Sequence, residues 1–132
     1  MGLCDVPESC DGVSTGCPAD AKQPNTAVCR LAVDLCDATE TCDGLSNDCP
    51  PDLLQPSSFT CRIQAGPCDV AETCDGTNTA CPTDAFVADG APSSGNLCNP
   101  YLCDGTQAAC PTSCSAPGDC VNPATCVSMT CQ

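Results

Sequence analysis

The chain has 132 residues, of which 18 are cysteine and none is histidine, and its formal net charge is -14. Leu, Ile, Val and Phe together number only 19, which is too few for a sizeable apolar core at this charge. The acidity excludes nucleic acid and anionic membrane surfaces as electrostatic partners, because Lys22, Arg30 and Arg62 are the only basic residues.

The cysteine content instead predicts a disulfide scaffold, in which covalent crosslinks replace the missing core. A metal-binding thiol protein is the alternative, but no two cysteines lie closer than four residues apart and no histidine could complete a zinc site. We therefore expect an oxidising location, either secreted and extracellular or at the cell surface. No apolar run is long enough for membrane insertion. The first residues show no export signal, so we expect Met1 to open a fragment or a sequence without its leader.

Repeats account for most of the chain. Residues 4–20 read "CDVPESCDGVSTGCPAD", and the same pattern of Cys, Asp, Glu and Gly returns 32 residues later at 36–52 and again at 68–84. The predicted organisation is repeat 1 over 1–35, repeat 2 over 36–67, repeat 3 over 68–97, a truncated repeat over 98–113 and a small Cys-rich knot over 114–132.

Turn residues dominate each repeat. Asp-Gly pairs begin at Asp11, Asp43, Asp75 and Asp104, and the 13 prolines leave no long amphipathic run. The predicted fold is therefore small, disulfide-rich and mostly irregular, with short β-ribbons and turns. Because each repeat would contact chiefly its neighbours, we expect an elongated rod.

Two segments that begin with Cys-Arg carry a resemblance to a known family. The stretch "CRLAVDLCDATETCDGLSNDCPPD" (29–52) and its counterpart at 61–84 resemble the C-terminal arm of the disintegrin domain of membrane-anchored and snake-venom metalloproteinases. The likeness covers residues 4 to about 98, but here the arm is tandemly repeated and no H-E-x-x-H protease motif is present. The resemblance implies disulfides Cys29–Cys49 and Cys61–Cys81 and leaves the other pairings open. By the same register the partner of Cys17 would lie before Met1, which again indicates a chain that began further upstream.

Acidic residues recur in three identical sets. Carboxylates held close together repel one another unless a cation lies between them, and Ca2+ prefers oxygen ligands of this kind. The predicted carboxylate ligands are Asp5, Glu8 and Asp20; Asp37, Glu40 and Asp52; and Asp69, Glu72 and Asp84. The resemblance adds the backbone carbonyls of Val6 and Ala21, Ala38 and Leu53, and Val70 and Ala85. We thus expect up to three structural Ca2+ ions. The alternative is that these acids form a solvated acidic surface. We also expect Arg30 and Arg62 to pair with Glu40 and Glu72.

No base and nucleophile pair is recognisable, so the protein is predicted not to be an enzyme. The predicted function is that of a calcium-stiffened, disulfide-stapled spacer or adhesion segment of a larger secreted or surface protein, with an extracellular or cell-surface protein as its partner. The alternative is an integrin ligand or a protease inhibitor that acts through the loops at 31–35 and 63–67. The sequence identifies neither the partner nor the oligomeric state.

Overall fold

The structure is a computed structural model that describes residues 2–132. Over this range it contains only short elements, and no helix is long and apolar enough to cross a membrane. The strands are β1 (Asp5–Val6), β2 (Ala21–Lys22), β3 (Val28–Arg30), β4 (Glu40–Thr41), β5 (Thr60–Arg62), β6 (Glu72–Thr73), β7 (Cys126–Val127) and β8 (Thr130–Cys131). Two 3-10 turns complete the set, η1 (Ser94–Asn96) and η2 (Pro117–Asp119). The predicted fold class, small and disulfide-rich with short ribbons and turns, is confirmed.

The strands pair as four separate antiparallel ribbons, β1 with β2, β3 with β4, β5 with β6, and β7 with β8. Arg30 lies opposite Glu40 in the second ribbon, and Arg62 lies opposite Glu72 in the third, 32 residues further along. Ribbons of two or three residues are not stable alone in water, so other interactions must hold them.

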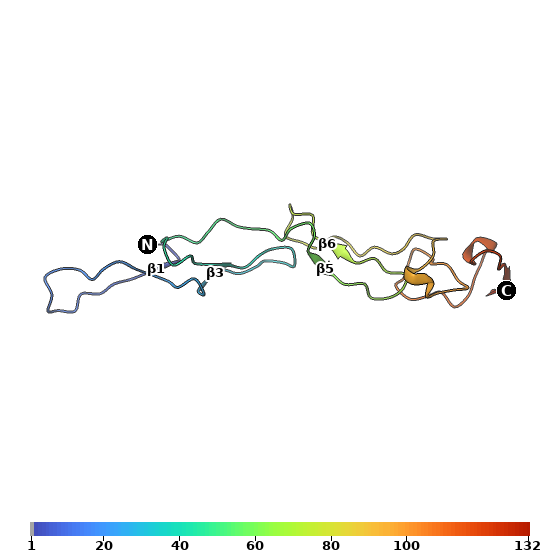
Figure 1. The fold of residues 1–132 in the computed structure, drawn as a ribbon, viewed down its shortest axis with the longest axis horizontal. Helices are drawn as coiled ribbons and strands as arrows, with labels where there is room; N and C mark the ends of the chain where they lie inside the picture. Colours follow the sequence, from blue (N-terminus) through green and yellow to red (C-terminus); the bar gives the residue numbers. More distant parts are fainter. Residues whose placement is uncertain (1) are drawn as a thin grey trace. The chain divides into compact units, whose positions relative to one another are not determined.

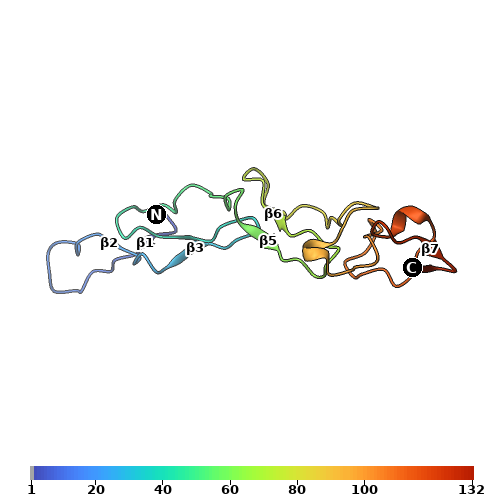
Figure 2. The ribbon, with the colours of Figure 1, turned by 45° about the vertical axis from the view of Figure 1, so that its right-hand side comes forward.

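The chain divides into two compact units. The first contains the residues up to Pro56 together with Gly76–Ala80, and the second contains Ser57–Asp75 and Cys81–Gln132. The course of the chain within each unit can be followed by colour in Figures 1 and 2. These units follow contacts rather than sequence similarity, so the repeat boundaries stay a prediction.

Cysteine side chains form the hydrophobic core. Every buried hydrophobic side chain among residues 2–132 belongs to a cysteine. Many larger apolar side chains lie outside: Val13 is 89% exposed, Leu45 is 82% exposed and Val33 is 80% exposed, while Val87 and Tyr101 pack partly buried against the cystines. Burial of apolar surface therefore contributes little beyond the cystines themselves.

Disulfides join segments that are distant in sequence. Cys4–Cys42 and Cys68–Cys103 link residues 38 and 35 positions apart, whereas the bonds near the C-terminus span 11 or 12. The bonds within single units are Cys4–Cys42, Cys29–Cys49, Cys61–Cys81, Cys68–Cys103, Cys98–Cys110, Cys114–Cys126 and Cys120–Cys131. They include both pairs that the resemblance implies. Cys36 and Cys74 are also disulfide-bonded, while Cys10 and Cys17 are free.

The Asp-Gly turns are built alike. Asp43 accepts hydrogen bonds through Oδ1 from the N–H groups of Leu45 (2.8 Å) and Ser46 (2.7 Å), and through Oδ2 from Ser46 Oγ (2.7 Å). Gly44 follows at a φ of 76°, a left-handed conformation that glycine adopts without steric cost. The bonds from Ser46 hold the pKa of Asp43 at about 2, and bonds from Ser14 and Val13 do the same for Asp11.

Removal of the Cys4–Cys42 bond should destabilise the first unit more than removal of Cys114–Cys126 destabilises the second. In the chain-entropy model the longer loop contributes about 4 kcal/mol and the shorter about 3 kcal/mol. Urea unfolding of the oxidised C4A/C42A and C114A/C126A variants, followed by resolved NMR signals of each unit, measures both losses. An unchanged first unit in C4A/C42A would contradict a core made of sulfur.

The S46A substitution should raise the pKa of Asp43 above about 2, because the hydroxyl donor to Oδ2 is lost. A depressed pKa stabilises the folded turn above the ordinary value of 3.8, and this stabilisation is lost as the pH falls toward 2. Titration of the carboxyl carbons by 13C NMR reports both aspartates, and Asp11 serves as the unchanged control in the same molecule. An unmoved Asp43 midpoint would show that the Ser46 hydroxyl does not set this pKa.

Candidate metal centre

Each of the three acidic sets has one basic side chain beside it. We define the first cluster as Asp5, Glu8 and Asp20, the second as Asp37, Glu40 and Asp52, and the third as Asp69, Glu72 and Asp84. Lys22 contacts the first cluster, Arg30 the second and Arg62 the third. Since the chain has only three basic residues, every positive side chain is used in this way.

The third cluster is the most closely gathered. Its three residues each offer a carboxylate oxygen, and these oxygens lie within 4.8 Å of one another. The pairing of β5 with β6 places Arg62 opposite Glu72, and Nη1 of Arg62 donates to Glu72 Oε2 at 3.0 Å and to Asp84 Oδ1 at 3.2 Å. The N–H of Ala85 donates to the other oxygen of Glu72 at 2.8 Å. Glu72 is thus buried with both carboxylate oxygens hydrogen-bonded.

Asp69 is held in place by its own loop. It is 3% exposed, and its two oxygens accept hydrogen bonds from the N–H of Ala65 at 2.5 Å and the N–H of Val70 at 2.9 Å. Its backbone forms an isolated antiparallel bridge with Phe86. This bridge positions Asp69 close to the segment that carries Asp84.

The second cluster has the same bonds but a looser arrangement. Nη1 of Arg30 donates to Glu40 Oε2 at 3.2 Å, to Asp52 Oδ1 at 3.3 Å and to the carbonyl of Pro50 at 3.1 Å. The N–H of Leu53 donates to Glu40 Oε1 at 3.0 Å. The ion pairs expected of Arg30 with Glu40 and of Arg62 with Glu72 are both present. Among the described residues, only the third cluster brings one oxygen from each of its acids within 4.8 Å.

Lysine replaces arginine at the first cluster. Nζ of Lys22 donates to Asp5 at 3.4 Å and makes a short bond to Asp20. The bond to Asp20 is the largest cause of the raised pKa of Lys22, while partial desolvation opposes it. Glu8 has no ion pair within residues 2–132 and accepts only the N–H of Ala21, at 2.6 Å. Sequence reasoning missed Lys22, although its place two residues after Asp20 could have indicated it.

The third cluster offers the carboxylate oxygens that a hard divalent cation takes as ligands. Carboxylates are the hard oxygen ligands that Ca2+ takes, and three of them beside one guanidinium leave two negative charges uncompensated. The predicted carbonyl of Ala85 accepts the N–H of Val70 at 3.1 Å, and that of Leu53 accepts the N–H of Ala38 at 3.0 Å. Each keeps a second lone pair for a metal. The groups of cysteines that lie close together consist of disulfide-bonded residues and offer no thiolate.

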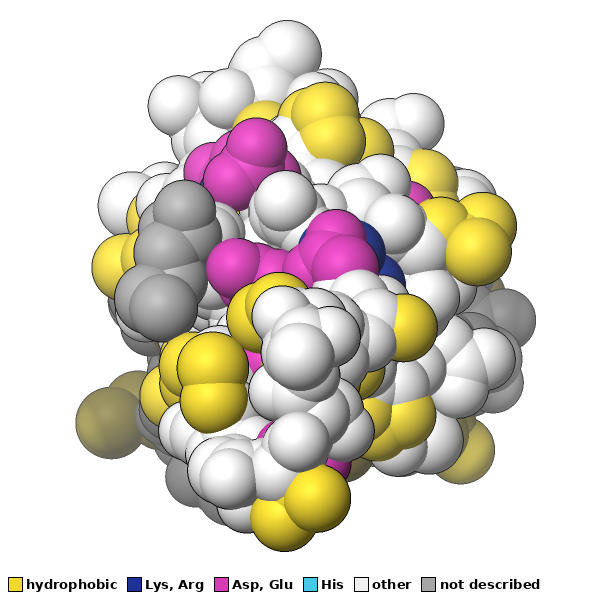
Figure 3. All heavy atoms as spheres, turned by 90° about the vertical axis from the view of Figure 1, so that its left-hand side faces the viewer, with side chains coloured by type: hydrophobic (Ala, Val, Ile, Leu, Met, Phe, Trp, Pro, Cys, Tyr) yellow, Lys and Arg dark blue, Asp and Glu magenta, His cyan; other side chains and the backbone are white. Residues whose placement is uncertain are grey.

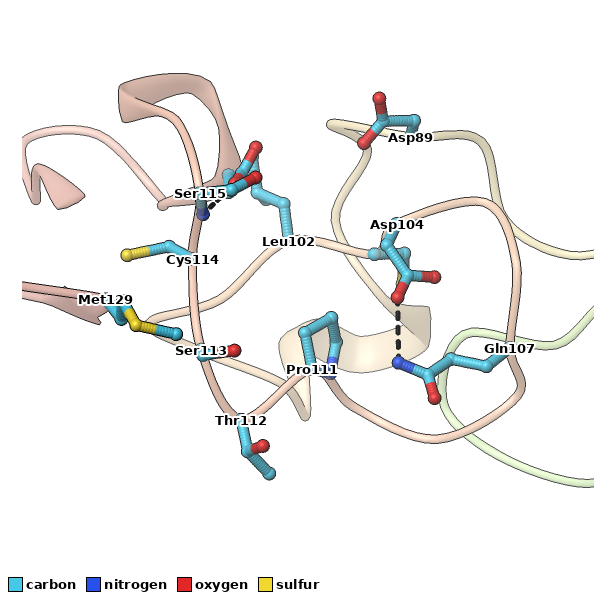
Figure 4. Close-up of a pocket in the computed structure, with 12 residues that line it drawn as sticks. Asp89, Leu102, Asp104, Gln107, Pro111, Thr112, Ser113, Cys114, Ser115 and Met129 are labelled. Atoms are coloured by element: carbon cyan, nitrogen blue, oxygen red, sulfur yellow. Dashed lines mark hydrogen bonds between the residues drawn. The ribbon is translucent and has the colours of Figure 1, made fainter.

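A separate cavity of about 440 Å³ lies in the second unit. Figure 4 shows its lining of carboxylates, hydroxyls and Met129. Asp104 accepts a bond from Gln107 Nε2 at 2.7 Å, and Asp119 accepts one from the N–H of Ser115 at 2.6 Å. Local backbone hydrogen bonds lower the pKa of both carboxyls, from Thr106 for Asp104 and from Ser115 for Asp119. Both carboxylates therefore serve as hydrogen-bond acceptors within their own turns.

Comparison with known proteins finds no matching family model, no matching curated protein and no matching solved structure. The chain is a small, heavily disulfide-bonded module, and this property fits an extracellular domain.

The E72Q substitution should lower the free energy of unfolding by about 1–3 kcal/mol, because an amide cannot replace the charged acceptor of Arg62. The matched control is E8Q, whose glutamate accepts the same kind of backbone N–H but has no arginine partner in the described chain. We expect the loss in E8Q to be less than half as large. Urea unfolding of both oxidised variants provides the comparison, and equal losses would show that the guanidinium contributes nothing.

Proposed function

We propose that this chain is a non-enzymatic extracellular spacer or adhesion segment, stapled by disulfides and stiffened by Ca2+ at the third cluster. The single observation that carries the proposal is the sulfur core, in which cystines provide every buried hydrophobic side chain of residues 2–132. A chain held in this way keeps its form without a folded apolar centre, and this is the property that a spacer needs.

Calcium would act at Asp69, Glu72 and Asp84. Their ligand oxygens lie within 4.8 Å of one another, and Arg62 alone neutralises only part of their charge. An ion there would link β6 to the segment after Cys81 and limit their relative motion. It would also compete with Arg62 for the oxygens of Glu72 and Asp84, because both positive groups use the same acceptors. The resemblance to disintegrin arms supports the same ligand set.

The loops that follow each Cys-Arg pair support an interaction role. Leu31 is 73% exposed, Val33 is 80% exposed and Ile63 is 79% exposed. Apolar side chains that gather in one exposed loop offer contact area to another protein. This observation favours adhesion, and it also keeps the second candidate, a receptor ligand or protease inhibitor acting through 31–35 and 63–67.

Calcium should stabilise the oxidised protein, by about 1.4 kcal/mol when its free concentration is ten times the Kd. The D84N variant should lose this effect because it removes a ligand charge, while the matched D52N variant of the second cluster should keep it. R62Q should bind Ca2+ more tightly than the unmodified chain, since its competing guanidinium is gone. Melting curves in Ca2+ and in EGTA, with calorimetric titration, measure these effects.

Two results would contradict the calcium proposal. One is a melting temperature that is the same in Ca2+ and EGTA, and the other is a shift that D84N and D52N reduce equally. The second would identify a diffuse response to the net charge of -14 rather than a site.

A further inference from the structure

The loop over residues 8–20 is built like the corresponding loop over 40–52, yet its cysteines have no partners. Asp11 accepts Ser14 Oγ at 2.7 Å just as Asp43 accepts Ser46 Oγ at 2.7 Å. Gly12 and Gly44 both have a φ of 76°. Cys10 and Cys17, however, are free and exposed. The first loop therefore has the conformation of a crosslinked loop without its crosslinks.

In the loop over 40–52, the equivalent cysteines bind an earlier part of the chain. Cys42 is bonded to Cys4, and Cys49 is bonded to Cys29. Backbone bonds accompany them, because the N–H of Cys4 donates to Asn47 at 2.9 Å and that of Cys42 donates to the carbonyl of Ala27 at 2.9 Å. The loop over 40–52 is therefore the surface on which the segment that carries Cys4 and Cys29 docks.

The approach is close enough to require glycine. A Cβ placed on Gly2 would lie 2.1 Å from the carbonyl oxygen of Asn47, so the incoming backbone lies directly on the loop. The second unit has the same contact: Cys103 is bonded to Cys68, whose N–H donates to Ala108 at 2.9 Å, and a Cβ on Gly66 would lie 2.3 Å from that carbonyl. The mode of docking is thus used more than once.

The loop over 8–20 is exposed to solvent. All residues from 9 to 20 are exposed. A Cβ on Gly12 or Gly16 would meet no atom within 4 Å, whereas one on Gly44 would lie 3.9 Å from the N of Asn25. In Figures 1 and 2 this loop, drawn in dark blue after β1, has no other segment of its unit beside it. Figure 3 shows hydrophobic side chains, a class that there includes cysteine, exposed beside acidic ones on this face.

The strand pairing is also incomplete. Glu40 and Glu72 lie in β4 and β6, where each faces an arginine on the paired strand. The corresponding Glu8 lies in no strand and has no arginine partner among residues 2–132. A segment that docks on the loop over 8–20 as residues 2–30 dock on the loop over 40–52 would supply both the missing paired strand and the arginine.

We propose that Cys10 and Cys17 form a covalent docking site for a polypeptide of the same kind as residues 2–30. Its partner presents a Cys-Asp cysteine and, 25 residues later as in Cys4 and Cys29, a Cys-Arg cysteine. The first bonds to Cys10 and the second to Cys17, and the arginine pairs with Glu8. A second copy of this chain cannot supply these thiols, because its equivalent cysteines are already in disulfides: Cys4, Cys29, Cys36, Cys61 and Cys68.

The chemistry is thiol–disulfide exchange. The thiolate of Cys10 attacks oxidised glutathione, forming a mixed disulfide and releasing one reduced glutathione. The partner thiolate then attacks the sulfur of Cys10 and releases the second reduced glutathione. Each new bond thus converts two thiols to a disulfide and reduces one molecule of oxidised glutathione, and Cys17 reacts in the same way.

The test uses the full chain and a synthetic probe of residues 2–31 that carries C10S and C17S, so that Cys4 and Cys29 are its only thiols. In a glutathione redox buffer we expect a one-to-one adduct with two disulfides, Cys10 to probe Cys4 and Cys17 to probe Cys29. Peptide mapping by mass spectrometry identifies the pairs. A scrambled probe with the same cysteine positions is the control, and its yield should be about tenfold lower, the factor expected for losing a charged hydrogen-bonded pair.

An R30Q probe tests the arginine contact. It should give a lower yield with the unmodified chain, and the E8Q chain should reduce the yield of the unmodified probe to a similar extent. Any of four results overturns the proposal. The first three are a Cys10–Cys17 disulfide within the chain, disulfide-linked dimers of the full chain, and mixed disulfides with glutathione as the only products. The fourth is bonding of Cys10 to probe Cys29 and of Cys17 to probe Cys4, with equal yields for the unmodified and scrambled probes.

Discussion

Covalent sulfur bonds are the constraint on which the rest of the structure depends. Among residues 2–132 every buried hydrophobic side chain belongs to a cystine, and the ribbons that these cystines hold contain only two or three residues per strand. Such ribbons have too little surface to be stable alone, so their register comes from the disulfides rather than from side-chain packing. The carboxylates of the third cluster are close together because Cys61–Cys81 and Cys68–Cys103 fix the segments that carry them.

The charge distribution follows from the same constraint. The disulfides bring acidic residues close together despite the electrostatic repulsion between their carboxylates. Each cluster has one basic side chain that offsets part of this repulsion. With so few basic residues, the chain retains a strong negative potential after these pairs are made. Such a surface raises the local concentration of cations around the chain.

Much of the fold could be predicted from sequence, because spacing determines it. The 32-residue register places Asp, Gly and cysteine at fixed positions, and the turns at Asp11 and Asp43 follow from local chemistry. Side-chain distances could not be predicted, since they depend on tenths of an ångström in the ribbons. Identical acids therefore gather in the third cluster but less closely in the second. Lys22 was missed because it follows its cluster in sequence, whereas Arg30 and Arg62 precede theirs.

The outward position of the apolar side chains has a thermal consequence. Leu31, Val33 and Leu45 are already in contact with water, so unfolding adds little new hydration of apolar surface. The heat capacity change of unfolding scales with that surface and sets the curvature of stability against temperature. For this chain the curve should be nearly flat, with neither a pronounced maximum nor an accessible cold transition. A module of this kind keeps similar stability across a wide range of environmental temperatures.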